Sequence, residues 1–182
     1  MPRVRRSAVR RSYRFPAYGG LFMVLAGAIG SASSGFADTA VPMTLAITNF
    51  DFRDTSGEVR DLSAEHAMRL KAMGITLQEG LTAGKRINVV PVTCEASKCS
   101  ARTAGLEALS IQARNAGAKY MLIGEVHKLS TLVGEMKFAV FDLTSNKPTC
   151  DRFLTYRGDT DEAWRRAAAF AANDIEKHCL PN

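Results

Sequence analysis

Four cysteines constrain the fold of this chain more than any other feature of its sequence. They are Cys94, Cys99, Cys150 and Cys179. The first two flank the short loop EASK, and this closeness favours a disulfide between them. A strand over 150–157 would extend ~23–26 Å, and a helix over about 161–178 would run back ~27 Å. A helix folded back along its strand therefore brings Cys179 beside Cys150, and two disulfides are predicted.

A zinc site is the alternative interpretation of the same residues. It would use Cys94, Cys99 and Cys150 with either His178 or Cys179. Structural zinc usually comes with tighter Cys-x2-Cys pairs than the spacing found here. His178 and Cys179 are also neighbours whose side chains would point in different directions. The sequence therefore favours disulfides, with no metal site and no cofactor.

The N-terminal part of the chain has the three regions of a secretory signal. A basic segment precedes an uncharged apolar run from Gly19 to Ala32, and small residues follow. Gly35 and Ala37 suit the −3 and −1 positions of signal peptidase. We therefore predict a cleaved signal peptide over 1–37, with cleavage after Ala37, and a single domain over 38–182. The alternative is an uncleaved anchor, although the apolar run is shorter than the ~20 residues needed to span a bilayer.

The route of export stays open between two systems. Arg10 and Arg11, followed by Ser12, Tyr13 and Arg14, resemble a twin-arginine signal, with tyrosine where phenylalanine is usual. The same residues also fit a long basic leader for the general secretory route. Both routes end outside the cytosol, where disulfides form. A periplasmic location is predicted in either case.

The basic character of the chain is confined to this leader. The net charge is +6, but residues 1–37 hold six arginines and no acidic residue. Removing these six from the 24 basic residues leaves 18, against 18 acidic residues. The exported part is therefore formally neutral, which argues against nucleic acid as a partner.

The apolar patterns of the exported part predict five strands and three helices. Strands are expected over 44–52, 86–92, from Tyr120 to about 130, over 133–143 and over 150–158. Helices are expected over 63–83, 101–116 and about 161–178. Alternation and apolar stripes support these assignments, and Pro91 places its strand at an edge or a strand end. The order strand-helix-strand-helix-strand-strand-strand-helix predicts a single α/β domain with a mixed five-stranded sheet.

The passage AGAKYMLIGEV, residues 116–126, has two possible interpretations, a structural scaffold and a phosphate-binding site. Gly117 suits the left-handed conformation that closes a helix. Tyr120–Ile123 form an unbroken apolar run, typical of a central strand covered on both faces. Gly124 indicates a bulge or a close backbone approach. A phosphate site needs a strand, then a glycine-rich turn, then a helix, and the order here is reversed. The passage is therefore predicted to be architectural.

Several segments resemble known families. LAITNFDFRDTS, AGAKYMLIGEVHKLSTLVGEMKFAVFDLTSNK and YRGDTDEAW resemble a family of small exported Gram-negative proteins known as a domain of unknown function. More remotely, the N-terminal domain of TolB and CsgG-like envelope proteins are similar in three shorter stretches: a strand ending in NFDF, the entry GAKY into the strand LIGEV, and a hairpin with FDLTS. This resemblance implies a TolB-like fold and a domain that makes protein–protein contacts without catalysis. The β-propeller of TolB and the lipid anchor of CsgG are missing, and the four cysteines belong to neither pattern.

Sequence motifs for catalysis are absent. A Ser-His-Asp trio could be drawn from Ser130, His127 and Asp142, but His127 is expected on a solvated strand face alternating with Glu125. The acidic residues Asp159, Asp161 and Glu162 could bind calcium, yet capping of the last helix by Thr160 or Asp159 explains them better.

We therefore expect no catalytic residues, no cofactor and no metal. The predicted function is that of a non-enzymatic periplasmic accessory protein, without a membrane span after signal cleavage, that docks on a protein partner in the envelope or periplasm. The alternative is a protein that binds a small molecule or a metal, with a pocket lined by His127 or the cysteines.

Overall fold

The computed structural model describes residues 41–94 and 99–181. The predicted signal peptide and its cleavage site lie outside these residues. Within them the elements follow in the order β1 (Met43–Ile47), β2 (Asp51–Asp54), α1 (Ser63–Ala83), β3 (Ile87–Val90), α2 (Ala101–Ala104), α3 (Leu106–Asn115), β4 (Tyr120–Lys128), β5 (Val133–Asp142), β6 (Lys147–Arg157) and α4 (Asp161–His178).

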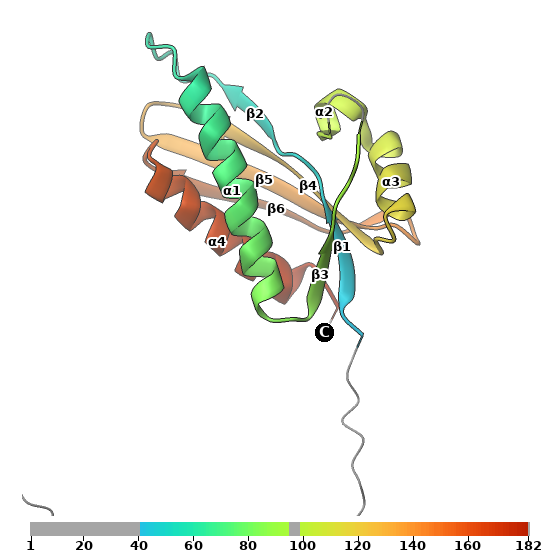
Figure 1. Ribbon diagram of the computed structural model, residues 1–182. Helices are drawn as coiled ribbons and strands as arrows, with labels where there is room; N and C mark the ends of the chain where they lie inside the picture. Colours follow the sequence, from blue (N-terminus) through green and yellow to red (C-terminus); the bar gives the residue numbers. More distant parts are fainter. Residues whose placement is uncertain (1–40, 95–98, 182) are drawn as a thin grey trace, which may run out of the picture. The chain divides into compact units, whose positions relative to one another are not determined.

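The strands form one mixed sheet in the order β3-β1-β4-β5-β6 (Figure 1). A mixed sheet is what the sequence predicts. β1 is parallel to both of its neighbours, β3 and β4. β4, β5 and β6 then run antiparallel to one another. β3 lies at one edge of the sheet, as Pro91 predicts, and β6 lies at the other.

The sheet has a sixth strand, because the single strand predicted over 44–52 is divided in two. β1 and β2 both pair with β4 in parallel, so that β2 continues along the same edge of β4. Between them, Asn49 forms a bridge with Ser100 instead. The ring of Phe50 lies over Gly124, where a Cβ would come within 2.5 Å of the ring. The close approach predicted at Gly124 is this contact.

The second predicted helix is also divided. Gly105 has φ +80° and separates α2 from α3, because a residue in that conformation cannot continue a right-handed helix. The structure therefore has four helices in its described part, where three were predicted. Gly117 has φ +80° as well and follows the end of α3, as expected for the residue that closes a helix.

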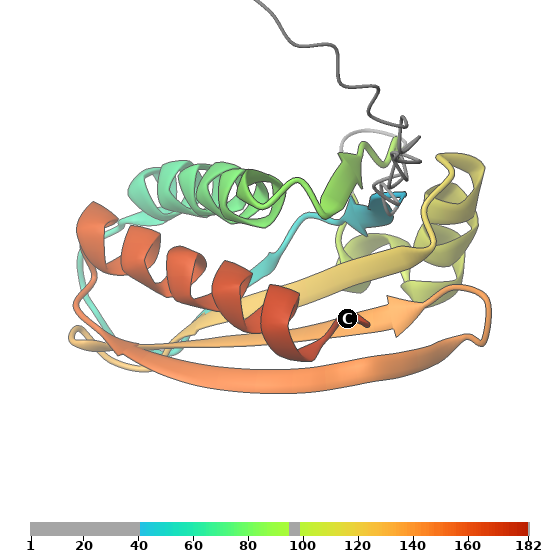
Figure 2. The ribbon, with the colours of Figure 1, turned by 90° about the horizontal axis from the view of Figure 1, so that it is seen from below.

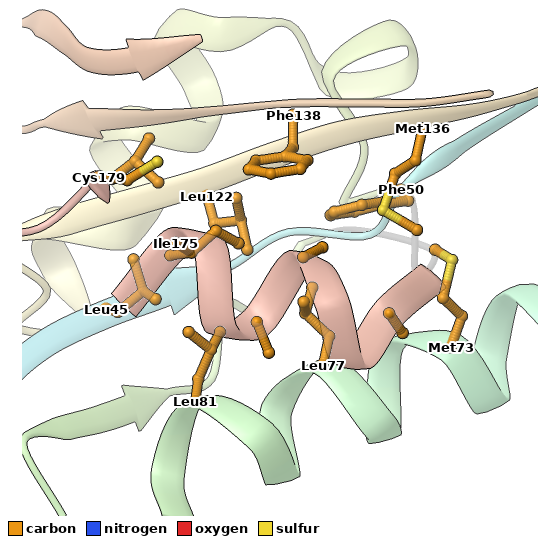
Figure 3. Packing of buried hydrophobic residues seen from close by; sticks show 14 of the residues in the cluster. Leu45, Phe50, Met73, Leu77, Leu81, Leu122, Met136, Phe138, Ile175 and Cys179 are labelled. Carbon is orange, nitrogen blue, oxygen red and sulfur yellow. The ribbon is translucent and has the colours of Figure 1, made fainter. Parts of the chain in front are cut away.

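The helices cover the two faces of the sheet unequally (Figure 2). α1 and α4 lie side by side on one face, where Met73, Leu77 and Ile175 pack onto Leu122 and Phe138 (Figure 3). α3 packs on the other face through Leu109 and Ala113, which belong to a second buried cluster with Ala46 and Met121. Because successive strand residues point to opposite faces, β1 and β4 contribute to both clusters.

Both cysteine pairs are disulfides, Cys94–Cys99 and Cys150–Cys179, with Cα–Cα distances of 5.4 and 5.1 Å. The second disulfide joins β6 to the end of α4, as the folded-back helix predicts. All four cysteines are thus paired, so the alternative zinc set is not assembled. Disulfides in both pairs are what is expected of an exported protein. Among the described helices, none is long and apolar enough to cross a membrane.

Candidate functional site

His127, near the end of β4, is buried and held by neighbouring side chains. Its Nε2 lies 2.7 Å from the Thr55 hydroxyl, and its Nδ1 lies 3.0 Å from Nη2 of Arg53. The residue is only 8% exposed, so the expectation of a solvated position is wrong. It does share a sheet face with Glu125, but Arg53 of β2 pairs beside it on one side and Glu135 of β5 on the other.

The other members of the possible Ser-His-Asp trio lie elsewhere. Ser130 accepts hydrogen bonds from the backbone N–H groups of Leu132 and Val133, so it shapes the turn between β4 and β5. Asp142 pairs with Tyr120 in the sheet, at the opposite end of β4 from His127. The structure therefore does not bring the three side chains together.

A buried cluster of charges forms around Asp159, at the start of α4. The carboxylate accepts hydrogen bonds from four side chains: His66 Nε2 at 2.8 Å, Arg69 Nη1 at 3.0 Å, Lys128 Nζ at 3.0 Å and Trp164 Nε1 at 3.1 Å. We call these five residues the Asp159 cluster. They come from α1, β4 and the first turn of α4, so the cluster joins three elements of the fold.

The charges of the cluster are held by their mutual contacts. Burial alone would raise the pKa of Asp159, but hydrogen bonds from His66, Lys128 and Trp164 outweigh it and lower the pKa to about 2. Burial would likewise lower the pKa of Lys128, yet its bonds to Glu58 and Asp159 raise it. Lys128 is only 3% exposed. A buried cation and a buried anion thus stabilise each other's charged form.

A hollow of about 600 Å³ between α1 and the start of α4 is lined by Arg69 and Trp164 of the cluster, but there is no room for a substrate at the carboxylate of Asp159. The hollow beside it, between Lys128, Tyr156 and Trp164, measures about 10 Å³, roughly the space of one water molecule. The His66 ring lies between two aromatic rings, 4.8 Å from Phe52 and 6.0 Å from Trp164. In the described chain, every buried side-chain N or O atom has a hydrogen-bond partner. The cluster therefore has a structural role, which is to hold α1, β4 and the start of α4 together.

The acidic residues considered as calcium ligands, Asp159, Asp161 and Glu162, form ion pairs, and their neighbour Thr160 caps the helix. Thr160 accepts a hydrogen bond from the N–H of Ala163 and caps α4, as predicted. Asp161 pairs with Arg69 and Glu162 with Arg165, both at 2.8 Å. No group of three possible metal ligands occurs in residues 41–94 and 99–181.

A groove of about 810 Å³ opens between α1 and the carboxyl ends of β1 and β3. Its lining is mostly apolar, from residues such as Leu70, Ile75 and Leu77 of α1 and Val89 and Val90 of β3. From β1 the chain continues through β2 to α1 on one face of the sheet, and from β3 it continues to α2 and α3 on the other face. A crevice between adjacent parallel strands whose connections diverge in this way is the usual ligand position in open α/β sheets.

A second surface is the part of the sheet that α3 leaves uncovered. It carries Glu135, Lys137 and Ala139 of β5, directly opposite Thr155, Phe153 and Asp151 of β6. We call these six residues the open face. Phe153 is 56% exposed, and the Lys137 ammonium lies 5.7 Å from its ring centroid. Their β6 neighbours on the opposite face, Cys150 and Leu154, pack against the core under α4.

These observations define a small mixed α/β domain with an apolar groove, an open sheet face and a charge cluster that has a structural role. Residues 43–175 match the family DUF3280, described as a protein of unknown function (DUF2380). The chain belongs to this family. Among curated protein sequences, none matches it.

Solved structures with a similar fold come from several bacteria. The hypothetical protein CT253 from Chlamydia trachomatis has a TM-score of 0.53 at 10% identity, with 78% of this chain and 100% of that chain covered. TolB from Acinetobacter baumannii has a TM-score of 0.47 at 14% identity, with 76% of this chain covered. A PelC dodecamer from Paraburkholderia phytofirmans also has 0.47 at 14% identity, with 77% of this chain and 90% of that chain covered.

These comparisons concern the fold. The match spans only 28% of the length of the TolB chain. The predicted resemblance to a family of unknown function and to TolB is confirmed. Similarity to CsgG stays a prediction. Sequence reasoning missed the groove, since its lining residues come from β1, α1, β3 and the surroundings of α2. Apart from Lys71 they are apolar or weakly polar, and they form no motif.

Proposed function

We propose that this chain is an exported, non-enzymatic accessory protein that docks on a protein partner in the cell envelope or periplasm. The observation that carries the proposal is the open face together with the free edge of β6. β6 has eleven residues, Lys147–Arg157, and within the described chain it pairs only with β5. A long edge strand presents unpaired N–H and C=O groups to which a partner strand can add.

The side chains beside this edge suit a protein partner. Phe153 offers an exposed aromatic ring, and aromatic residues are enriched in protein interfaces. Around it lie charges of both signs, Lys137, Glu135 and Asp151. An aromatic anchor inside a ring of mixed charges resembles the apolar core and polar rim of a transient interface. The partner we propose is an extended segment that pairs with β6 and covers Phe153.

The absence of enzymatic activity is part of the proposal. The hollow that Asp159 lines is too small for a substrate, and the Ser130, His127 and Asp142 side chains lie apart. Among the described residues, Lys71 is the only one with an ionisable side chain that lines the groove, apart from the disulfide-bonded Cys99. A lone exposed lysine lacks the partner base or orienting group that acid–base and nucleophilic catalysis require.

Export by a cleaved leader is proposed from the sequence of residues 1–37 and the two disulfides. The intact mass of the protein isolated from the periplasm tests this directly. A mass equal to residues 38–182 less four hydrogens is expected, because each disulfide removes two. Retention of Met1 together with four alkylatable thiols would contradict both export and the disulfides.

Photo-crosslinking tests the docking surface. A photoreactive phenylalanine analogue replaces Phe153 on the open face or, as a matched control, Phe170 on α4, which is 60% exposed on the other side of the sheet. After irradiation of whole cells, position 153 should capture one envelope or periplasmic protein and position 170 should not. Equal capture from both positions, or none from either, would overturn the proposal. A crosslink between two copies of this chain would indicate self-association instead.

A further inference from the structure

We propose that the groove between α1 and the carboxyl ends of β1 and β3 binds a single-chain amphiphile with an anionic head group. This site is separate from the open face, and it adds a ligand that protein docking does not require. The apolar chain lies along Leu70, Ile75 and Val89, and the anionic group lies at Lys71.

The size and position of the groove suit a small ligand. Its volume of about 810 Å³ falls in the range of ~300–1,000 Å³ that is typical of small-molecule sites. It lies where the chain leaves two adjacent parallel strands toward opposite faces, the position at which open α/β sheets bind ligands. Ile75 in its wall is 50% exposed, so an apolar side chain of α1 faces solvent until something covers it.

Gly74 gives a second reason to regard the groove as a built site. A glycine inside a helix costs about 0.5–1 kcal/mol relative to alanine. At Gly74 no tight packing requires it, because a Cβ would meet no atom within 4 Å. The residue lines the groove in the middle of α1. Its missing side chain keeps the groove wide at this point.

The charge of the residues that line the groove indicates which head group the ligand has. Within the described part of the chain, Lys71 is the only cation that lines the groove, and no aspartate or glutamate lines it. Lys71 also has no carboxylate partner among the described residues. Asn49, Gln78 and Ser100 add neutral polar groups. An anionic group at Lys71 is therefore complementary in charge, whereas a cationic head group would be repelled.

The presence of a single cation in the described lining also favours a free amphiphile over a membrane surface as the ligand. Binding to anionic bilayers uses clusters of several lysines and arginines, each contributing about 1 kcal/mol. The described lining of the groove supplies one such residue, and the exported part of the chain is formally neutral. A single ligand that leaves the bilayer and enters the groove fits these observations better than adhesion of the whole protein to lipid.

A fluorescence titration tests the inference. The probe is dansyl-labelled undecanoic acid, with the corresponding primary amide as an uncharged control, added to the purified protein with both disulfides formed. The acid should bind with a blue-shifted emission, and more tightly than the amide. Lys71→Gln should weaken binding of the acid about fivefold, as expected for an exposed ion pair, and leave the amide unchanged.

Paired variants locate the binding site. Gly74→Trp should fill the groove and weaken binding of the acid at least tenfold, while Gly74→Ala should change it less than twofold. Phe153→Ala, on the open face, should bind the probe normally. Its behaviour therefore separates this inference from the docking proposal. Thermal melting followed by circular dichroism verifies that each variant is folded, and Lys71→Gln provides the test if Gly74→Trp does not fold.

Three results would overturn the inference. The first is no binding of the acid to the parent protein, and the second is equal binding of the acid to Gly74→Trp and to the parent. The third is flotation with phosphatidylglycerol vesicles that persists in Gly74→Trp, since it would show adhesion to a membrane surface without use of the groove.

Discussion

The Asp159 carboxylate lies 2.8 Å from Nε2 of His66, a residue 93 positions earlier in the sequence. This contact joins the start of α4 to the first turns of α1. Lys128, at the end of β4, contacts the same carboxylate oxygen at 3.0 Å. Three elements that are distant in the chain thus meet at one side chain, so we expect its ionisation to be coupled to folding.

We expect Asp159 to make stability depend on pH in the acid range. Its pKa falls from 3.8 to about 2 in the folded protein. The stabilisation is therefore fully present above pH 3.8 and is lost as the pH falls through about 2. A shift of this size corresponds to about 2 kcal/mol of unfolding free energy. Urea unfolding between pH 7 and pH 2 measures it.

Asp159→Asn should remove that part of the pH dependence and lower stability at pH 7. Asp151→Asn is the matched control, because Asp151 is an exposed carboxylate on β6, and it should leave the pH profile unchanged. If Asp159→Asn and the parent lost stability in parallel between pH 4 and pH 2, the ionisation of Asp159 would not be coupled to folding.

Removal of the Lys128 charge should be more damaging than removal of an exposed charge. Lys128→Met leaves Glu58 and Asp159 without their 2.7 Å and 3.0 Å partner. Breaking one side of a buried ion pair costs about 3–5 kcal/mol. Lys137→Met, on the open face, should cost less than about 0.5 kcal/mol. Chemical denaturation of both variants at pH 7 makes the comparison, and similar losses would contradict the structural role of the cluster.

The two disulfides should contribute unequally to stability. Their cysteines are separated by 5 positions in Cys94–Cys99 and by 29 positions in Cys150–Cys179. Loop-closure entropy then gives about 2 kcal/mol for the first and about 3.6 kcal/mol for the second. Alanine replacement of each pair, followed by urea unfolding, should reproduce this order. A larger loss from the short loop would show that entropy does not decide the difference.

Gly124→Ala should destabilise the fold through a steric contact. The added methyl group would come within 2.5 Å of the Phe50 ring, and overpacking of this kind costs about 1–3 kcal/mol. The second change Phe50→Leu should recover part of the loss, because it removes the ring. Thermal unfolding of the single and double variants measures the coupling. Additive losses would exclude a direct contact as the cause.

The fold was largely predictable because its signals are local. Apolar stripes located α1 and α4, alternation located β5 and the end of β4, and the reach of one strand and one helix paired Cys150 with Cys179. The divided elements were not predictable in the same way. The break between β1 and β2 depends on where Phe50 and Asn49 find partners, and those partners lie more than 50 positions away.

The candidate sites were harder to predict for a related physical reason. His66, Lys128 and Asp159 are ordinary residues in the sequence, and each alone is consistent with an exposed helix or strand position. Only the parallel pairing of β2 with β4 and the packing of α1 on α4 bring them together. The sequence gives even less indication of the groove, because the groove is defined by the missing side chain at Gly74 and by the spacing between elements.

The disulfides join cysteines that are consecutive along the chain, the first to the second and the third to the fourth. Four cysteines allow three connectivities, and this is the one in which the two closed loops neither overlap nor enclose each other. The loop closed by Cys94 and Cys99 ends before the loop closed by Cys150 and Cys179 begins. In the chain-entropy model, two loops that share no residues restrict separate parts of the unfolded chain, so either cross-link can be removed without changing the loop that the other closes.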